Sequence, residues 1–72
     1  MKRTTDDLVR IAYAGGGFTI DAKNYTTNEL VRISAAASKH GSRIHILNAN
    51  RNTTDELVRI AAASKGCVTF EL

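Results

Sequence analysis

TTDELVRIAAASKG, residues 53–66, is the most informative segment of the sequence, because the 72-residue chain contains it in three versions. TTDDLVRIAYAGGG starts at residue 4 and TTNELVRISAAASKHG at residue 26, so the three starts are 22 and 27 residues apart. A repeat of that length is typically one supersecondary unit. We therefore predict a single domain, residues 1–72, made of three repeats that span 4–25, 26–52 and 53–72.

Each copy opens with a sequence that favours a helix start. The first threonine can accept a hydrogen bond from a free N–H of the first turn, and the acidic side chain three positions later can accept one from the N–H of that threonine. The pairs that fit this capping box are Thr26 with Glu29, Thr53 with Glu56 and, with the shorter aspartate, Thr4 with Asp7.

The predicted helix of each copy has one apolar side. Leucine, isoleucine and then alanine or serine recur at helical spacing. The glycines that follow, preceded in two copies by cations, predict where the helices end: Gly15 to Gly17, Gly41 and Gly66. The residues on the apolar side are Leu8, Ile11, Ala12, Leu30, Ile33, Ser34, Leu57, Ile60 and Ala61.

After each helix, apolar residues alternate with polar ones, which is the period of a strand. The predicted strands span 18–21, 43–47 and 68–72. The middle strand allows two registers. Its own alternation turns Ile44 and Ile46 inward, whereas counting back from the next Thr-Thr aligns Leu47 with Ile20. A bulge could reconcile the two, and we favour Ile44 and Ile46.

The order helix, strand, helix, strand, helix, strand predicts an α/β fold with a small parallel sheet, because short helical crossovers join parallel strands. Polar residues interrupt the strands on one side, which disfavours a sheet covered on both faces. We therefore expect all three helices on one face of the sheet, in a solenoid-like arrangement, with the other face open to water or to a partner.

This pattern resembles a miniature leucine-rich-repeat protein, in which short strands and helices alternate along a curved solenoid. The resemblance is carried by the repeated Leu-Val-Arg-Ile helices, the strand Ile44-His45-Ile46-Leu47, and Asn24 or Asn50 in the turn after a strand. It implies an architecture and a common mode of use, protein binding through the sheet face. No catalytic residue is carried over.

The open sheet face is the predicted binding site. A rigid platform of mixed polar groups suits recognition of a protein partner more than covalent chemistry. We expect a small non-enzymatic protein that acts as an inhibitor or adaptor, in the manner of compact antagonists carried by phages and plasmids. The side chains predicted on this face are Thr19, Asp21, His45, Thr69 and Glu71.

The alternative is a nucleic-acid-binding homo-oligomer that uses the row Arg10, Arg32 and Arg59, which occupy the same place in every copy. The net charge of +3 is modest and spread along the chain, so it does not single out nucleic acid. An aspartate four residues earlier can pair with the first and last arginine. Arg32 has Asn28 there instead, which predicts that it is the least neutralised of the three.

The last predicted strand is apolar and is expected at a sheet edge, with Val68, Phe70 and Leu72 as its self-association residues. A 72-residue chain buries only about 60% of the surface that its unfolded form exposes. Covering the edge with a second copy would enlarge a small core, so we predict a homodimer or a larger homo-oligomer.

Other chemistry is disfavoured by the sequence. The triple glycine follows a helix and opens a strand, the reverse of a phosphate-binding loop. His40 and His45, even with Asp21, Glu71 or Cys67, show no metal-site spacing, and we predict no cofactor, metal or enzymatic activity. The single cysteine excludes an internal disulfide. No apolar stretch approaches the about 20 residues of a membrane span, so we predict a cytoplasmic protein without membrane contact.

Overall fold

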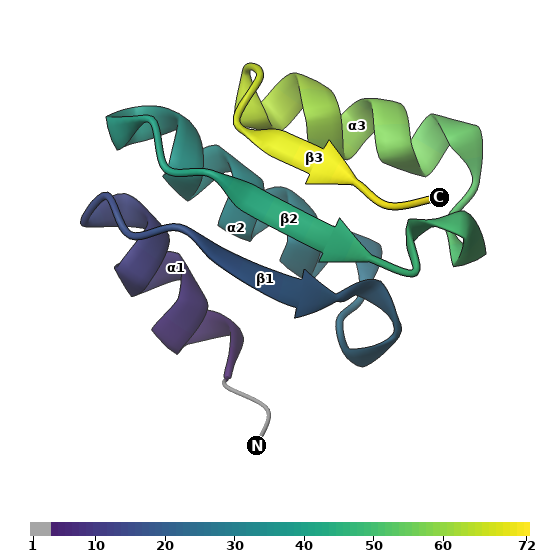
Figure 1. Ribbon diagram of the computed structural model, residues 1–72, viewed down its shortest axis with the longest axis horizontal. Helices are drawn as coiled ribbons and strands as arrows, with labels where there is room; N and C mark the ends of the chain where they lie inside the picture. Colours follow the sequence, from purple (N-terminus) through teal and green to yellow (C-terminus); the bar gives the residue numbers. More distant parts are fainter. Residues whose placement is uncertain (1–3) are drawn as a thin grey trace.

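A computed structural model describes residues 4–72 of the chain. Its order of elements is the predicted alternation of helix and strand, with a short 3₁₀ helix after each of the first two strands (Figure 1). The elements are α1 (Thr5–Tyr13), β1 (Phe18–Asp21), η1 (Ala22–Asn24), α2 (Thr27–His40), β2 (Ile44–Leu47), η2 (Ala49–Arg51), α3 (Thr54–Ser64) and β3 (Val68–Phe70).

The molecule has two layers. The strands form one parallel sheet in the order β1-β2-β3, so β1 and β3 are its edges. The three helices lie together behind the sheet, and the opposite sheet face is uncovered (Figure 1). The predicted α/β class, with a small parallel sheet and helices on one face, is confirmed.

Local capping explains why the helices begin where they do. At α2 the N–H of Thr26 donates to Glu29 Oε1 at 2.8 Å, and the N–H of Glu29 donates to Thr26 Oγ1 at 3.2 Å. The same reciprocal pair starts α3, between Thr53 and Glu56. At α1, Thr4 accepts from the N–H three residues later. Each helix therefore begins at the threonine that the sequence indicates.

The helix ends follow the predicted glycines with one difference. Gly41 closes α2 in the left-handed conformation, with φ 71°. At α3 the left-handed cap is Lys65, one residue before Gly66, so the predicted stop at Gly66 was wrong by one position. After α1, Gly15 has φ 101°, and a Cβ on Gly17 would lie 2.6 Å from the carbonyl oxygen of Arg43. The triple glycine thus permits a turn and a close approach to the start of β2.

Pairing of the strands decides the open question of register. Ile44 pairs with Phe18 and Val68, and Ile46 pairs with Ile20 and Phe70. Both isoleucines of β2 are 1% exposed, so the favoured inward register is confirmed. The alternative, with Leu47 aligned to Ile20, is wrong because Leu47 pairs with Asp21 one residue later. Strand pairing is one to one here, so alternation along β2 sets its faces.

The core lies between the helices and the sheet. Its largest fully buried apolar side chains are Leu30 and Ile33 of α2, Ile44 and Ile46 of β2, and Ile60 of α3. The central helix and the central strand contribute most because they have neighbours on both sides. A buried hydroxyl secures the packing: Ser42 Oγ donates to the carbonyl oxygen of Ala12 at 2.7 Å and joins the end of α1 to the approach to β2.

Candidate functional site

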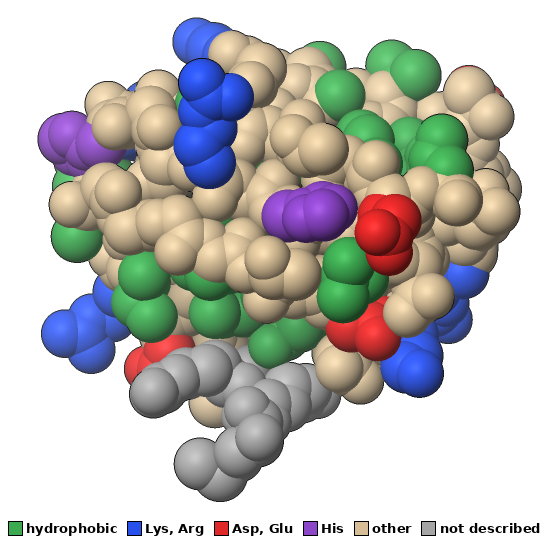
Figure 2. Space-filling model, viewed as in Figure 1, with side chains coloured by type: hydrophobic (Ala, Val, Ile, Leu, Met, Phe, Trp, Pro, Cys, Tyr) green, Lys and Arg blue, Asp and Glu red, His purple; other side chains and the backbone are tan. Residues whose placement is uncertain are grey.

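The uncovered sheet face displays one continuous row of polar side chains. Thr19, His45 and Thr69 occupy corresponding positions on the three strands. Strand alternation turns them away from the core, and Thr19 and Thr69 are exposed. Figure 2 shows a histidine near the middle of this face, with acidic groups to one side of it. The structure therefore brings three of the five predicted sheet-face residues into one line.

A shallow hollow of about 360 Å³ is formed around this row. The threonines are small, so they leave room beside the larger imidazole of His45. The hollow is lined by Gly17, Phe18, Thr19, Arg43, Ile44, His45 and Thr69. This surface offers hydroxyl, imidazole and guanidinium groups over a rigid sheet, a mixture that suits hydrogen bonding to a protein surface.

The other two predicted sheet-face residues lie towards the carboxyl ends of the strands. Asp21 ends β1, and its carboxylate accepts from the N–H of Lys23 at 3.0 Å and from Asn48 Nδ2 at 2.8 Å. The bond from Lys23, and then that from Asn48, lowers the pKa of Asp21 below its ordinary value of 3.8. Glu71 is exposed beyond β3, and its N–H donates to Ile46 O at 2.9 Å. Asp21 therefore has a structural role in the turn.

Sequence reasoning missed Leu47 on this face. It pairs with Asp21 and is half-buried, and strand alternation puts it on the same side as His45. It escaped notice because the middle strand had two possible registers, one of which turned this leucine inward. With the register known, Leu47 is an apolar side chain on this face, next to the acidic residues Asp21 and Glu71 at the carboxyl ends of the strands.

Two of the three arginines in the predicted row contact the preceding helix. Arg32 Nη2 lies 3.1 Å from Asp6 Oδ1 on α1, and Arg59 Nη2 lies 3.5 Å from Asn28 Oδ1 on α2. The expectation that Arg32 is the least neutralised arginine was wrong, because its partner comes from the preceding helix and not from its own. Among residues 4–72, Arg10 forms no ion pair.

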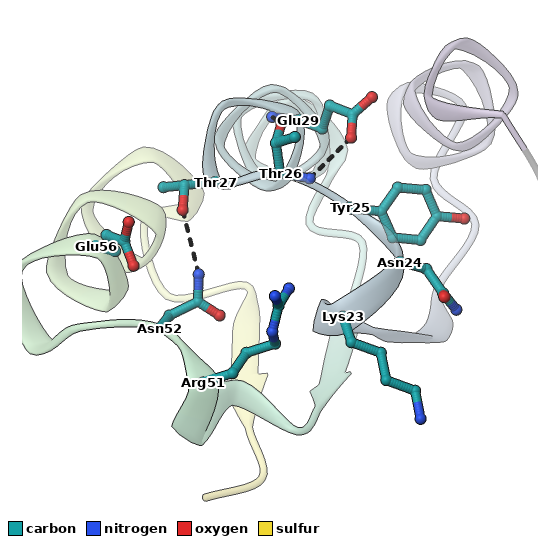
Figure 3. Close-up of a pocket in the computed structure, with 9 residues that line it drawn as sticks. All are labelled: Lys23, Asn24, Tyr25, Thr26, Thr27, Glu29, Arg51, Asn52 and Glu56. Carbon is teal, nitrogen blue, oxygen red and sulfur yellow. Dashed lines mark hydrogen bonds between the residues drawn. The ribbon is translucent and has the colours of Figure 1, made fainter.

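A second hollow, of about 610 Å³, lies at the carboxyl ends of the strands, between η1, η2 and the starts of α2 and α3 (Figure 3). The sequence did not indicate it. Figure 3 shows the guanidinium of Arg51 pointing into the hollow, while Lys23 extends away from it. The lining residues are Lys23, Asn24, Tyr25, Thr26, Thr27, Glu29, Arg51, Asn52 and Glu56.

Groups around this turn hollow are already used by the fold. Arg51 Nη1 donates to the carbonyl oxygen of Ala22 at 3.2 Å. Glu56 caps α3, and the bond from the Thr53 backbone is the main reason why the pKa of Glu56 lies below its ordinary value of 4.5. Burial, and next the charge of Glu29, raises the pKa of Tyr25 above 10.0. Carboxylates thus already accept the hydrogen bonds of the backbone N–H groups at the starts of α2 and α3 beside this hollow.

The residues predicted for self-association lie at the sheet edge as expected, but not all in the strand. Val68 and Phe70 belong to β3 and are half-buried against the core. Leu72 follows the strand and is 73% exposed. Two of the three side chains are thus partly buried in their own molecule, and the exposed one, Leu72, lies beyond the strand.

Histidine and cysteine side chains are separated in the described part of the chain. His40 packs edge-to-face on Tyr13, with ring centroids 5.1 Å apart, whereas His45 lies on the sheet. Among residues 4–72, no group of three or more His, Cys, Asp or Glu side chains could hold a metal ion. None of the helices formed by these residues combines the length and the apolar character needed to cross a membrane.

Comparison of the chain with protein-family models, with curated proteins and with solved structures gives no match.

Proposed function

We propose that this chain is a small, solenoid-like, leucine-rich-repeat-like protein that binds a protein partner through its sheet face and also associates with itself. It works without catalysis, as an inhibitor or adaptor in the cytoplasm, a role of the kind that phage and plasmid antagonists fill. The observation that carries the proposal is the uncovered row Thr19, His45 and Thr69 beside the hollow of about 360 Å³.

Two properties of this face support a protein as the partner. The row is fixed by parallel strand pairing, so binding requires little ordering of the backbone. The face also combines hydrogen-bonding groups with the half-buried Leu47, and its acidic end disfavours a polyanion. A nucleic acid fits the opposite helical side better, where the arginine row lies. Arg32 and Arg59 on that side already donate to Asp6 and Asn28, which weakens the alternative.

The test begins with the tagged chain in its native cell, followed by mass spectrometry of the proteins that purify with it. Each candidate is then produced in pure form, and its affinity for the wild-type chain is measured by calorimetry. Three variants follow: His45→Glu on the sheet face, Arg32→Glu on the helical row, and Lys39→Glu, which changes the charge as much as Arg32→Glu does, as a control at an exposed position of α2. Circular dichroism confirms that all three fold.

We expect His45→Glu to weaken binding at least about tenfold, as for one central interface residue worth over 1 kcal/mol, and the other two to bind as the wild type does. The opposite pattern, in which Arg32→Glu abolishes binding and His45→Glu does not, contradicts the proposal. A strong fall of affinity with rising salt, measured with an oligonucleotide in place of the protein, would then identify the nucleic-acid alternative.

A further inference from the structure

Corresponding helix positions differ in exposure according to which helix they belong to. Ile33 and Ile60 are 0% exposed, whereas Ile11 is 39% exposed. These isoleucines stand at the same place in the three copies of the repeat. In α2 and α3 this side of the helix lies next to the preceding helix, whereas no helix of residues 4–72 precedes α1. We call this exposed side of α1 the leading face, formed by Asp7, Arg10, Ile11 and Ala14, which line a hollow of about 390 Å³.

The last helix shows the reverse difference on its other side. Leu8 and Leu30 are buried, as are Ala12 and Ser34, in the two helices that have a following helix beside them. In α3 the corresponding positions are more open: Leu57 is half-buried, Ala61 is exposed, and Val58 is 59% exposed. We call Leu57, Val58 and Ala61 the trailing face. The residues of α1 and α2 that correspond to Leu57 and Ala61 are buried in the molecule.

Polar contacts between neighbouring helices follow a rule that leaves one arginine and one aspartate without an ion pair among residues 4–72. Arg32 of α2 pairs with Asp6 of α1, and Arg59 of α3 donates to Asn28 of α2. The arginine of one helix thus always contacts the second helical residue of the helix before it. Continuing this rule leaves Arg10 on the leading side and Asp55 on the trailing side. Within residues 4–72, neither of these two forms an ion pair.

The sheet also has one outer strand at each side, and each of these pairs with β2 alone. β1 and β3 are its two edges, and all pairing in it is parallel. Parallel addition of another β1 to β3 would continue the sheet without reversing any strand. A two-fold pairing of β3 with β3 would instead be antiparallel and would place one α3 beside another, so that Asp55 could not meet Arg10.

From these four observations we infer that a second copy of this chain docks head to tail, with its leading face on the trailing face and its β1 alongside β3. The inference rests on the self-association in the proposed function and specifies its geometry. Leu57, Val58 and Ala61 of one copy meet Ile11 and Ala14 of the next, and Asp55 meets Arg10. Because the two faces differ, the contact is heterologous, and each added copy offers a new trailing face.

Two complementary blocked variants test this geometry. Ile11→Lys blocks the leading face and Val58→Lys blocks the trailing face, and both side chains are already exposed, so the fold tolerates them. Asn50→Lys places the same charge on η2, away from both faces, as a control. Masses are measured by analytical ultracentrifugation and folding by circular dichroism. The wild type and Asn50→Lys should form species larger than the 7.8 kDa chain.

Each blocked variant alone should remain a monomer, because it has lost one of the two faces that a contact needs. An equimolar mixture should form a heterodimer of twice the 7.8 kDa chain mass and nothing larger, since only one productive contact is available. A two-fold contact predicts otherwise: at least one variant would still dimerise alone, and mixing would add nothing. That result overturns the inference, as does a wild-type monomer at about 1 mM.

A charge exchange provides an independent readout. Arg10→Asp and Asp55→Arg should each reduce assembly, because each puts like charges at its own contact. Mixed together they should alternate and restore it, and failure to restore argues against this pairing. Assembly of His45→Glu should equal that of the wild type. The two proposals can therefore fail separately. Partner binding in His45→Glu tests the sheet-face proposal, and assembly of the blocked variants tests this inference.

Discussion

Replacing Ser34 with alanine should stabilise the protein. Ser34 is 0% exposed in the middle of the central helix, and no hydrogen-bond partner for its Oγ is present among residues 4–72. A buried hydroxyl without a partner costs about 1–3 kcal/mol. The corresponding positions of the other two helices, Ala12 and Ala61, already carry alanine. The hydroxyl is thus an exception within the repeat.

The expected gain follows from three contributions. Removing the unpartnered hydroxyl contributes at least about 1 kcal/mol, and the better helix propensity of alanine adds up to about 0.5 kcal/mol. The void left by one oxygen atom opposes these with a loss of about 0.5 kcal/mol, below the roughly 1 kcal/mol of a missing methyl group. The net increase in the free energy of unfolding of Ser34→Ala is therefore about 1 kcal/mol, which raises the melting temperature of a domain this small by about 4–8 °C.

Urea unfolding followed by circular dichroism measures this change, and the matched control is Ser38→Ala on the same helix. Ser38 Oγ donates to the carbonyl oxygen of Ala35 at 2.7 Å, so its removal loses a made hydrogen bond of about 1 kcal/mol and should leave stability unchanged or slightly lower. The reasoning is refuted if Ser34→Ala is no more stable than Ser38→Ala, because its hydroxyl must then have a partner.

Three further predictions concern the pH dependence of stability, a substitution of Gly17, and the surface ion pair between Arg32 and Asp6. The lowered pKa of Glu56 means that its carboxylate stabilises the fold above pH 4.5. This contribution to the free energy of unfolding should be lost as the pH falls below that value. Glu56→Gln should flatten the pH dependence of urea unfolding in this range. Gly17→Ala should cost about 1–3 kcal/mol of unfolding free energy, since its Cβ would lie 2.6 Å from the Arg43 carbonyl oxygen; an unchanged urea midpoint would contradict this close approach. A double-mutant cycle on Arg32 and Asp6, whose side chains are 57% and 81% exposed, should give a coupling of at most about 0.5 kcal/mol that disappears in about 1 M salt.

The two proposals reinforce each other physically. Continuing β3 into the β1 of a second copy would extend the row Thr19, His45 and Thr69 across the contact, since the row runs perpendicular to the strands. Several copies of the binding face would then lie side by side on one rigid sheet. A partner with repeated sites would bind such an assembly more tightly than a monomer, because the second contact becomes intramolecular.

Features that depend on neighbours a few residues apart could be predicted from the residue pattern. Thr26 and Glu29 start α2 because both hydrogen bonds of the capping box close within one turn. Alternation within β2 favours Ile44 and Ile46 as its inward residues, although only the pairing with β1 and β3 excluded the other register. Gly41 ends α2 because it adopts a positive φ at no steric cost. Such interactions are local, so the residue pattern is enough to predict them.

Contacts between distant parts of the chain could not be predicted in this way, because they depend on how the helices and strands pack together. Arg32 finds Asp6, 26 residues earlier, in preference to anything on its own helix. The identical leucines of the repeat likewise differ, since Leu30 is buried and Leu57 half-buried. Their local sequences are nearly the same, and the difference arises because α2 has a helix on both sides and α3 on one. Which copies of a repeated residue are buried depends on their place in the stack, a property that no single copy of the sequence contains.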